Sequence, residues 1–259
     1  MSHSGPTPFP ENSRDYLTSH LPFVKPHTAE EYFTVLLGRA IQATLTGDYG
    51  ISAALVVRHQ AVELVSLARN TAISEYDPFG HAEANAIRHL RDFLDLDFAE
   101  RARNVLLWSD PLSVANSGNR IYVRQASPGS PGRESVMYTT LEPCPMCTVA
   151  IMNSRIQSVI IATADEPGGA LAPERLAKLP GVWPQLAASQ HLQVNFASSQ
   201  CRDDPGTYIT DPLSALLRSA FWETKDLRDT ELSKGVLFKP DMPAELTGLL
   251  EAAASEPPG

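Results

Sequence analysis

The chain has 259 residues, of which 43% are hydrophobic and 20% charged, and its formal net charge is −9. This length and composition are typical of a globular protein with one domain of about 200 residues plus tails. No apolar run reaches the roughly 20 residues needed to span a bilayer, and the N-terminus lacks the basic and apolar regions of a secretory signal. The negative charge disfavours partners held by their phosphates. We therefore expect a cytoplasmic protein with reduced thiols and no membrane partner.

The first part of the chain predicts a tail, a helix, a hairpin and a second helix. Residues 1–27 carry several prolines and are expected to form an N-terminal tail or arm. Thr28-x-x-Glu31 forms a capping box for a helix whose apolar residues recur at helical spacing until Gly47. ISAALVV and VELVSLA flank RHQA, as the strands of a β-hairpin would. A helix over Ala82–Leu94 follows.

Residues 110–133, DPLSVANSGNRIYVRQASPGSPGR, are the least foldable interior stretch. A loop of this length inside a compact domain is either disordered or functional. We expect a long insertion here that serves as a lid or an interface loop, with disorder as the alternative.

The second part alternates strands and helices. SVMYTTLEP, QSVIIATAD and HLQVNFA read as strands, and CPMCTVAIMNSRI, LAPERLAKL and PLSALLRSAFWETKDLRD read as helices. This alternation predicts an α/β sandwich whose later strands are parallel. The folded domain is expected over residues 28–240, and residues 241–259 are expected to form a C-terminal tail.

Three cysteines are an odd number, which makes a disulfide framework improbable and favours a metal-binding or catalytic use of Cys144 and Cys147. The two are spaced i, i+3, so they share one face of a helix. Pro143 and Pro145 bracket Cys144, which indicates a helix N-terminus, where the dipole favours the thiolate that binds metal. Zinc needs at least one ligand more, and His81, at the start of another helix, is the natural candidate.

Three protein ligands leave a fourth position for water, as in catalytic zinc sites, where the pKa of the water falls to roughly 7. Glu83 is placed to move the protons, provided that it and His81 converge in the first helical turn. Taken alone, the C-x-x-C motif is a redox motif or a chance occurrence as often as a metal site, and H-x-E carries almost no information. H-A-E followed by P-C-x-x-C, in contrast, is the signature of zinc-dependent nucleobase deaminases.

On these motifs the sequence resembles the cytidine-deaminase superfamily, and within it the branch of bacterial guanine deaminases and tRNA adenosine deaminases. DPFGHAEANAI is similar to that branch's D-P-T-A-H-A-E-x-x-A-I, and TLEPCPMCTVAIMNSRI is similar to its T-L-E-P-C-x-M-C-x-x-A-I-x-x-S-R-I. The resemblance covers roughly residues 30–200. It implies a three-layer α/β/α sandwich around a mixed sheet of about five strands.

The same resemblance implies roles for individual residues. His81, Cys144 and Cys147 would be the ligands of Zn²⁺, and Glu83 would carry protons. Asn70 would contact the substrate, because members of the branch place an asparagine eleven residues before the histidine; the alternative is a turn residue after a strand. A homodimer is also implied.

Two features depart from the branch. Phe79 and Gly80 replace Thr-Ala, and 63 residues separate His81 from Cys144, more than in short members. The additional residues between His81 and Cys144 lie in the 110–133 region. They bear on which substrate is bound, and not on the chemistry of the reaction. Cys201 is expected to be a semi-buried thiol, with a fourth zinc ligand as the alternative. Four aromatic residues are expected in the core or at an interface rather than as a substrate platform: Trp108, Trp183, Phe221 and Trp222.

These observations predict a zinc-dependent hydrolytic deaminase of a free nucleobase, nucleoside or similar amino-heterocycle, purine-type and guanine-like first. One alternative is an adenosine or cytidine deaminase of tRNA or another nucleic acid, for which a basic stripe would be needed and none is obvious. The other is an inactive zinc-binding scaffold, against which the presence of Glu83 argues.

Overall fold

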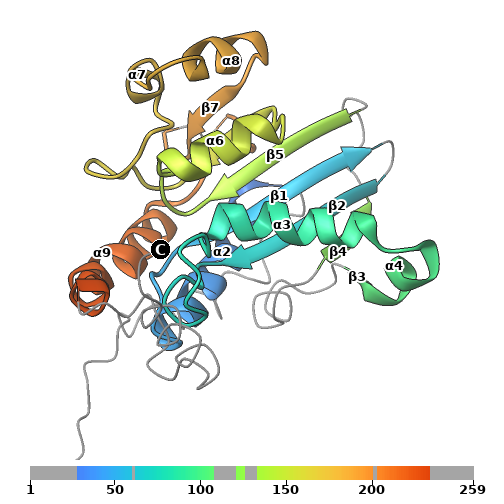
Figure 1. Ribbon diagram of the computed structural model, residues 1–259, viewed down its shortest axis with the longest axis horizontal. Helices are drawn as coiled ribbons and strands as arrows, with labels where there is room; N and C mark the ends of the chain where they lie inside the picture. Colours follow the sequence, from blue (N-terminus) through green and yellow to red (C-terminus); the bar gives the residue numbers. More distant parts are fainter. Residues whose placement is uncertain (1–27, 60–61, 108–120, 126–132, 201–202, 234–259) are drawn as a thin grey trace, which may run out of the picture.

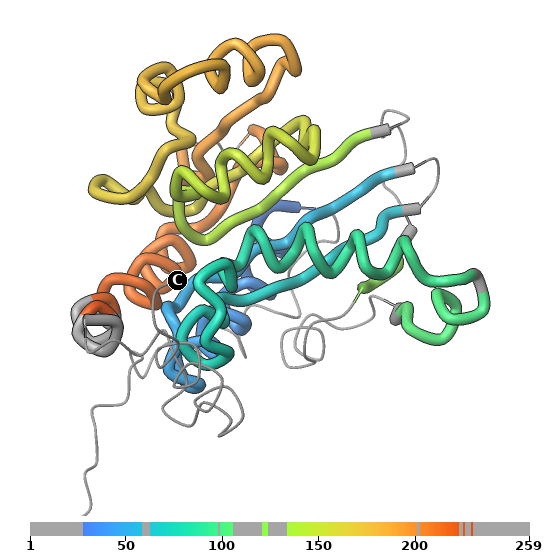
Figure 2. Tube along the Cα trace, in the orientation of Figure 1, coloured from blue at the N-terminus to red at the C-terminus, as the bar shows by residue number. Residues whose placement is uncertain are grey.

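The computed structural model describes residues 28–59, 62–107, 121–125, 133–200 and 203–233 (Figure 1). The predicted tails, 1–27 and 241–259, lie outside these residues. The described part forms three layers, with a mixed sheet between helices on both of its faces, as Figures 1 and 2 show. The predicted α/β/α class is therefore confirmed.

Helix α2 (Ala29–Leu45) begins where the capping box places it. The Thr28 side chain accepts a hydrogen bond from Glu31 N at 3.2 Å, which satisfies one of the free amides of the first turn. The helix ends before Gly47, whose φ of 94° is easily reached only by glycine. The predicted hairpin follows as β1 (Ser52–His59) and β2 (Val62–Arg69), paired antiparallel from Ser52 opposite Arg69.

The sheet has seven strands in the order β3-β4-β2-β1-β5-β6-β7. Its remaining members are β3 (Val105–Leu107), β4 (Ile121–Gln125), β5 (Arg133–Thr139), β6 (Ser158–Ile161) and β7 (Gln193–Phe196). Strand β1 pairs antiparallel with β5, whereas β5, β6 and β7 run parallel to one another, as predicted.

Both faces of the sheet are buried. Alternate residues of β1 belong to different cores: Ala54 and Val56 face α2 and α9 (Asp211–Ser233), whereas Ala53 and Leu55 face α3 (Ala82–Asp95) and α6 (Pro145–Asn153). This alternation follows from the two-residue period of a strand. It explains why the strands read as continuous apolar runs.

The long connection after α3 is more ordered than the sequence predicted. Helix α4 (Phe98–Asn104) begins at Asp97, whose side chain accepts a hydrogen bond from Glu100 N at 2.8 Å. Strand β4 lies inside the segment 110–133 that was expected to be a loop, and it pairs antiparallel with β2 and parallel with β3. The two strands account for the difference between seven strands and the expected five. The rest of the insertion, residues 110–120 and 126–132, lies outside the described part, so its role as a lid or interface loop stays a prediction.

The second half also contains short helices. Helix α7 (Pro173–Leu176) is a single turn within the predicted LAPERLAKL helix, and α8 (Trp183–Ser189), which the sequence did not predict, precedes β7. The last helix, α9, packs beside α2 on one face of the sheet. No helix within the described ranges combines the length and apolarity required to cross a membrane.

Candidate metal centre and its cavity

His81 is the N-cap residue of α3, where its backbone is extended (φ −72°, ψ 147°). The preceding loop is closed by hydrogen bonds from Thr71 N to Gly80 O and from Gly80 N to Asp77 O, both 2.8 Å. A Cβ atom on Gly80 would lie 2.9 Å from Thr71 Oγ1 and 3.0 Å from Ala72 N. Glycine in place of the alanine expected from the resemblance therefore permits the close packing that positions His81.

Asn85, on the next turn of α3, ties this loop to its surroundings. Its Nδ2 atom lies 3.1 Å from Arg69 O, 3.0 Å from Thr71 Oγ1 and 3.2 Å from Gly80 O. The side chain thus connects the end of β2, the loop and the start of the helix. The sequence did not single out Asn85, because its role depends on backbone oxygens that only the fold brings together.

Cys144 and Cys147 occupy the first turn of α6, as predicted. Cys144 is the N-cap residue, Pro145 takes the first helical position, and Thr148 N donates to Cys144 O at 2.9 Å. Cys147 is fully buried and Cys144 half-buried. Free amides and the helix dipole at this end favour a thiolate.

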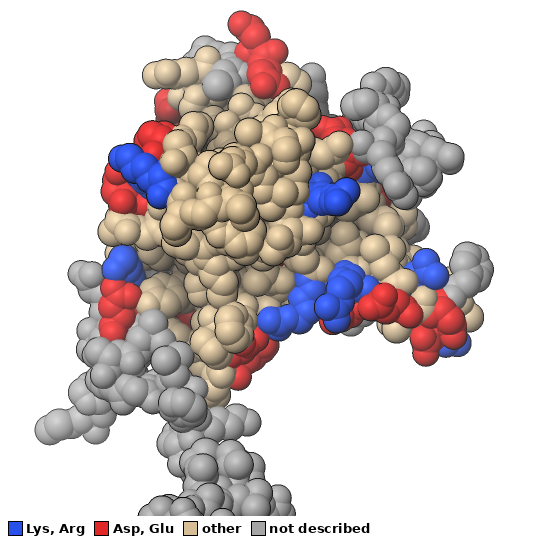
Figure 3. Space-filling view, turned by 45° about the horizontal axis from the view of Figure 1, so that its top comes forward, with Lys and Arg blue, Asp and Glu red and all other residues tan. Residues whose placement is uncertain are grey.

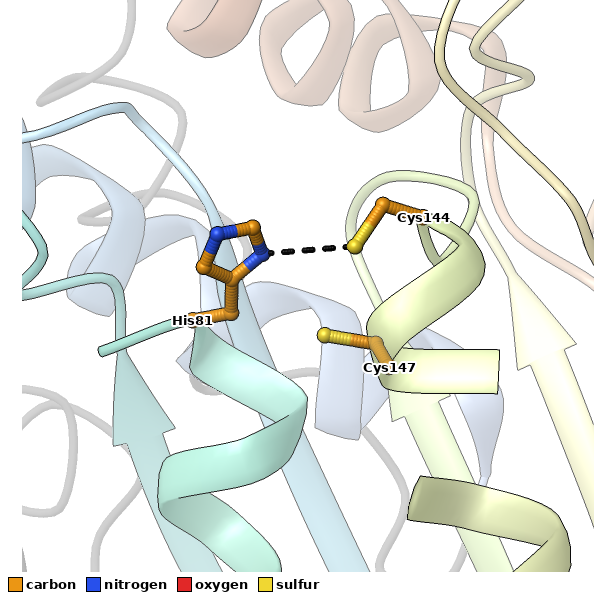
Figure 4. A group of neighbouring side chains, drawn as sticks. All are labelled: His81, Cys144 and Cys147. Atoms are coloured by element: carbon orange, nitrogen blue, oxygen red, sulfur yellow. Dashed lines mark hydrogen bonds between the residues drawn. The ribbon is translucent and has the colours of Figure 1, made fainter. Parts of the chain in front are cut away.

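The structure brings the three predicted ligands together. The ligand atoms of His81, Cys144 and Cys147 all lie within 4.8 Å of one another. His81 Nδ1 faces Cys144 Sγ at 3.5 Å, and both sulfur atoms point from α6 toward the ring (Figure 4). Two thiols and one imidazole from two helix N-termini are a donor set that suits tetrahedral zinc with one position open. The residues present therefore fit Zn²⁺.

The electrostatics of the cluster match this donor set. Hydrogen bonding to the Cys147 thiol lowers the pKa of Cys144 to about 4. The same hydrogen bond, together with burial, raises the pKa of Cys147 above its usual range. The Cys144 sulfur in turn raises the pKa of His81. Cys144 is thus the thiol that ionises more readily, and a metal ion would displace any protons held by Cys147 and His81.

Glu83 lies in the first turn of α3 and lines the same cavity as His81. The two side chains therefore converge, as the predicted role of Glu83 requires. Its side chain is buried, and burial raises its pKa above the ordinary value of 4.5. Thr139 at the end of β5 donates a hydrogen bond from Oγ1 to Glu83 Oε1 at 2.7 Å. Thr139 is a second residue that the sequence did not identify, because β5 and α3 meet only in the folded chain.

Asn70 also lines the cavity, and it is 2% exposed. Its Oδ1 accepts a hydrogen bond from Ala72 N at 3.1 Å, so Asn70 does stabilise a turn after β2. Among the described residues, no hydrogen bond from Nδ2 is present, which leaves the amide donors for the cavity. The two interpretations of Asn70 are therefore compatible.

The cavity has a volume of about 310 Å³ and is lined from both sides of the sheet. The β1–β2 and α3–α6 side supplies Ile51, Asn70, His81, Glu83, Leu141 and Cys144. A second wall comes from α9, with Phe221, Lys225 and Asp229, and the loop residues Tyr49, Glu142 and Asp165 complete the lining. The sequence missed this second wall. The four-residue spacing of Phe221, Lys225 and Asp229 marks a common helix face, but the pattern does not reveal that this face meets the metal centre.

Glu142 fixes the loop that carries Asp165. It is buried and accepts hydrogen bonds from Ala172 N at 2.9 Å, Asp165 N at 3.3 Å and Arg175 Nη1 at 2.5 Å. Asp165 itself is 8% exposed, and burial raises its pKa. Glu142 therefore ties the Asp165 loop in place, and both acidic residues line the cavity.

The remaining candidates have different outcomes. Phe221 is buried, as the expectation of a core residue required, and it also lines the cavity. Trp222 is 36% exposed and contacts the Phe221 ring edge-on at 4.9 Å, whereas Trp183 is half-buried at the start of α8. Cys201 and Trp108 lie outside the described residues.

Known proteins share these features. The sequence model of the cytidine and deoxycytidylate deaminase zinc-binding region matches residues 27–163. A tRNA-specific adenosine deaminase of Aquifex aeolicus is 28% identical over 141 residues, which are 54% of this chain and 70% of that protein. Its counterpart from Haemophilus influenzae is 27% identical over 142 residues, or 55% of this chain and 62% of that protein.

The structure of a guanine deaminase from Nitrosomonas europaea aligns over 85% of this chain and 97% of that one, with 16% identity and a TM-score of 0.42. The family assignment rests on the sequence match, which spans more than half of the chain and includes the whole His81, Cys144 and Cys147 cluster. The chain therefore belongs to the cytidine and deoxycytidylate deaminase family, the zinc-dependent deaminases that the match identifies.

Proposed function

We propose that the protein is a hydrolytic deaminase of a free purine-type base or nucleoside, with a guanine-like ring first, and that it releases ammonia. The observation that carries this proposal is the carboxyl group of Glu83, which shares a small cavity with the metal-binding cluster and is held there by Thr139. A purely structural zinc site has no use for such a group. The scaffold alternative is disfavoured for this reason.

His81, Cys144 and Cys147 would hold the zinc ion, through Nδ1 and the two Sγ atoms. When bound, zinc supplies the Lewis acidity that makes water nucleophilic near neutral pH. The reaction then consumes one water and exchanges the exocyclic amine of the ring for oxygen, with ammonia as the second product.

Glu83 would move the protons. Its carboxylate takes a proton from the attacking water and passes it to the ring nitrogen next to the amine-bearing carbon. After the water oxygen has bonded to the ring carbon, Glu83 takes the remaining proton from that oxygen. It delivers this proton to the amine as the C–N bond breaks. The raised pKa of a buried carboxyl suits this alternation between base and acid.

The cavity favours a small ligand without phosphate. Its described lining holds four carboxyl groups and a single lysine or arginine, Lys225, so phosphate would meet repulsion from most directions. Its volume of about 310 Å³ lies near the lower end of the roughly 300–1,000 Å³ of ligand pockets. The Nδ2 donors of Asn70 suit an acceptor on a base edge or a ribose hydroxyl.

The runner-up is deamination of adenosine or cytidine in tRNA or another nucleic acid. The names of the two bacterial relatives, both tRNA-specific adenosine deaminases, favour it. The acidic cavity and the net charge of −9 weigh against it, because each phosphate contact requires a local cation. A cytoplasmic location is part of the proposal and is inferred from the sequence.

The test is ammonia release by the zinc-loaded protein over a panel of bases, nucleosides, nucleotides, aminotriazines and unmodified tRNA, with Glu83→Ala as the control. We expect turnover of guanine or guanosine first, and adenosine second, with no turnover by the control. Inosine formed only in tRNA would establish the runner-up instead. Turnover of cytidine-type rings alone would retain the chemistry and refute the purine assignment.

A further inference from the structure

We propose that Lys225 and Asp229 of α9 determine the substrate by binding a lactam edge, a ring carbonyl next to a ring N–H, on the amino-heterocycle. This inference rests on the proposed function, because it concerns the ligand of the same cavity. It narrows the substrate class to rings that carry both an amine and an adjacent lactam, of which guanine is the purine example.

The first observation is the placement of α9. Phe221, Lys225 and Asp229 follow one another at four-residue intervals, so they lie on one face of the helix. All three line the cavity that also contains His81 and Cys144. In Figure 4 a helix in the colour of α9 lies above the cluster, on the side of His81 and Cys144. A ring with its reacting carbon at the metal centre would direct another of its edges toward this wall.

The second observation is that the polar groups of this wall are held in place. Tyr49 donates a hydrogen bond from its hydroxyl to Asp229 Oδ1 at 2.7 Å, and Lys225 Nζ pairs with Asp229 Oδ2. The charge of Lys225 also acts on Asp165, which lines the same cavity. Lys225 is therefore held by Asp229 rather than extended into solvent, and its side chain is 28% exposed.

The third observation is the apolar surface beside the pair. The rings of Phe221 and Tyr49 lie 6.2 Å apart at an angle of 36°, and Ile51 and Leu141 line the same cavity. Flat heterocycles bind well to such a surface. The apolar surface would fix the plane of the ring, and Lys225 and Asp229 would recognise the groups on its edge.

The chemistry of the pair selects the edge. An ammonium group only donates hydrogen bonds and an ionised carboxylate only accepts them. Neighbouring on one helix face, they present a donor beside an acceptor, which complements a carbonyl beside an N–H. A ring with hydrogen in place of the carbonyl oxygen cannot accept a hydrogen bond from the ammonium group. Sites built to hydrogen-bond a ligand group discriminate strongly against analogues that lack it.

The test compares guanine with 2-aminopurine. Both carry the reacting amine at C2, but 2-aminopurine lacks the C6 oxygen and the N1 proton. We expect kcat/KM of the wild-type protein to favour guanine. Lys225→Met and Asp229→Asn should each reduce this preference by about tenfold to a hundredfold, the range for a hydrogen bond to a charged group. The loss should fall on guanine, with 2-aminopurine little affected.

The matched control is Lys178→Met, an exposed lysine after α7 that does not line the cavity; its preference should equal that of the wild type. Zinc content and circular dichroism are measured for every variant to check its fold. If Lys225→Met does not fold, Asp229→Asn, a nearly isosteric change, still tests the inference. If Lys225→Met and Asp229→Asn are folded and zinc-loaded and still prefer guanine over 2-aminopurine as strongly as the wild type does, the inference is overturned. The deaminase proposal would stay intact. Failure of the wild type to deaminate either ring would instead refute the purine assignment itself.

Discussion

The hydroxyl of Thr139 lies between two acceptors. Its Oγ1 is 2.7 Å from Glu83 Oε1 and 2.9 Å from Leu141 O. A hydroxyl has one proton, so it donates to only one of these oxygens at a time. It can therefore donate to the Glu83 carboxylate, or turn to Leu141 O and accept a proton from the Glu83 carboxylic acid. Thr139 thus supports both protonation states that a proton carrier must visit.

Replacement of Glu83 by glutamine preserves the shape of the side chain and removes its acid–base function. We expect Glu83→Gln to bind zinc like the wild type and to lose at least about 10²-fold in kcat/KM, the low end for a positioned acid–base group. Thr139→Val should cause a smaller loss, because the carboxyl group stays present without its orienting hydroxyl. Steady-state kinetics with zinc analysis measure both. Wild-type turnover by Glu83→Gln would remove Glu83 from the mechanism.

Zinc binding should depend on pH with a definite sign. Cys147 and His81 have raised pKa values in the metal-free cluster, so both tend to hold a proton that zinc must displace. As pH rises, fewer protons remain and zinc binds more tightly. Each displaced proton makes the apparent zinc affinity rise about tenfold per pH unit. We therefore expect the apparent affinity to increase by at least about tenfold per pH unit. Chelator competition between pH 6 and 8 measures the slope, and an affinity that is independent of pH would contradict it.

The loop from Asn70 to Gly80 is held by a residue of another element. Asp48, after α2, is fully buried and accepts hydrogen bonds at Oδ1 from Ile73 N (2.9 Å) and Ser74 N (2.8 Å). Its Oδ2 pairs with Arg69 Nη1 at 3.1 Å. One carboxylate therefore joins the end of α2, the end of β2 and the loop that leads to His81.

Removal of this carboxylate should loosen the metal centre from a distance. We expect Asp48→Ala to lower the free energy of unfolding by about 2–3 kcal/mol, since charged hydrogen bonds are lost within the protein, and also to weaken zinc binding. Urea denaturation and zinc titration are the measurements. The control is Asp92→Ala, whose carboxylate is 57% exposed and pairs with Arg91 at 3.6 Å, and it should change stability by less than about 0.5 kcal/mol. Equal stability of both variants would show that Asp48 does not support the loop.

Sequence patterns predicted the parts of the fold that local chemistry decides. The Thr28 cap, the hairpin and the helix start at Cys144 all depend on residues within a few positions of each other. The second wall of the cavity could not be predicted in this way, because α9 meets the metal centre only through packing on α2 and the sheet. Strand β4 was missed for a related reason, since its five residues become a strand by pairing with β2 inside a segment rich in turn-forming residues.

At the scale of the whole molecule, charge is unevenly distributed. Neither α6 nor α8 contains a charged residue, although α3 and α9 contain many. Figure 3 accordingly shows a broad face without charged side chains, with basic and acidic groups toward its margins. Uncharged faces of this kind are typical of contacts between protein subunits, where charged residues are depleted from the centre.

We therefore expect the homodimer implied by the family resemblance to form through the face of α6 and α8. Val182, which precedes α8 and is 61% exposed, should lie in or beside the contact. Val182→Glu would place a charge against an apolar partner surface and raise the dimer dissociation constant at least about tenfold. Leu45→Glu, at the end of α2 on the opposite side of the sheet and 69% exposed, is the matched control and should leave assembly unchanged. Sedimentation over a wide concentration range distinguishes the outcomes: a wild type that stays monomeric would refute the dimer, and a dimer weakened only by Leu45→Glu would move the contact to the α2 side.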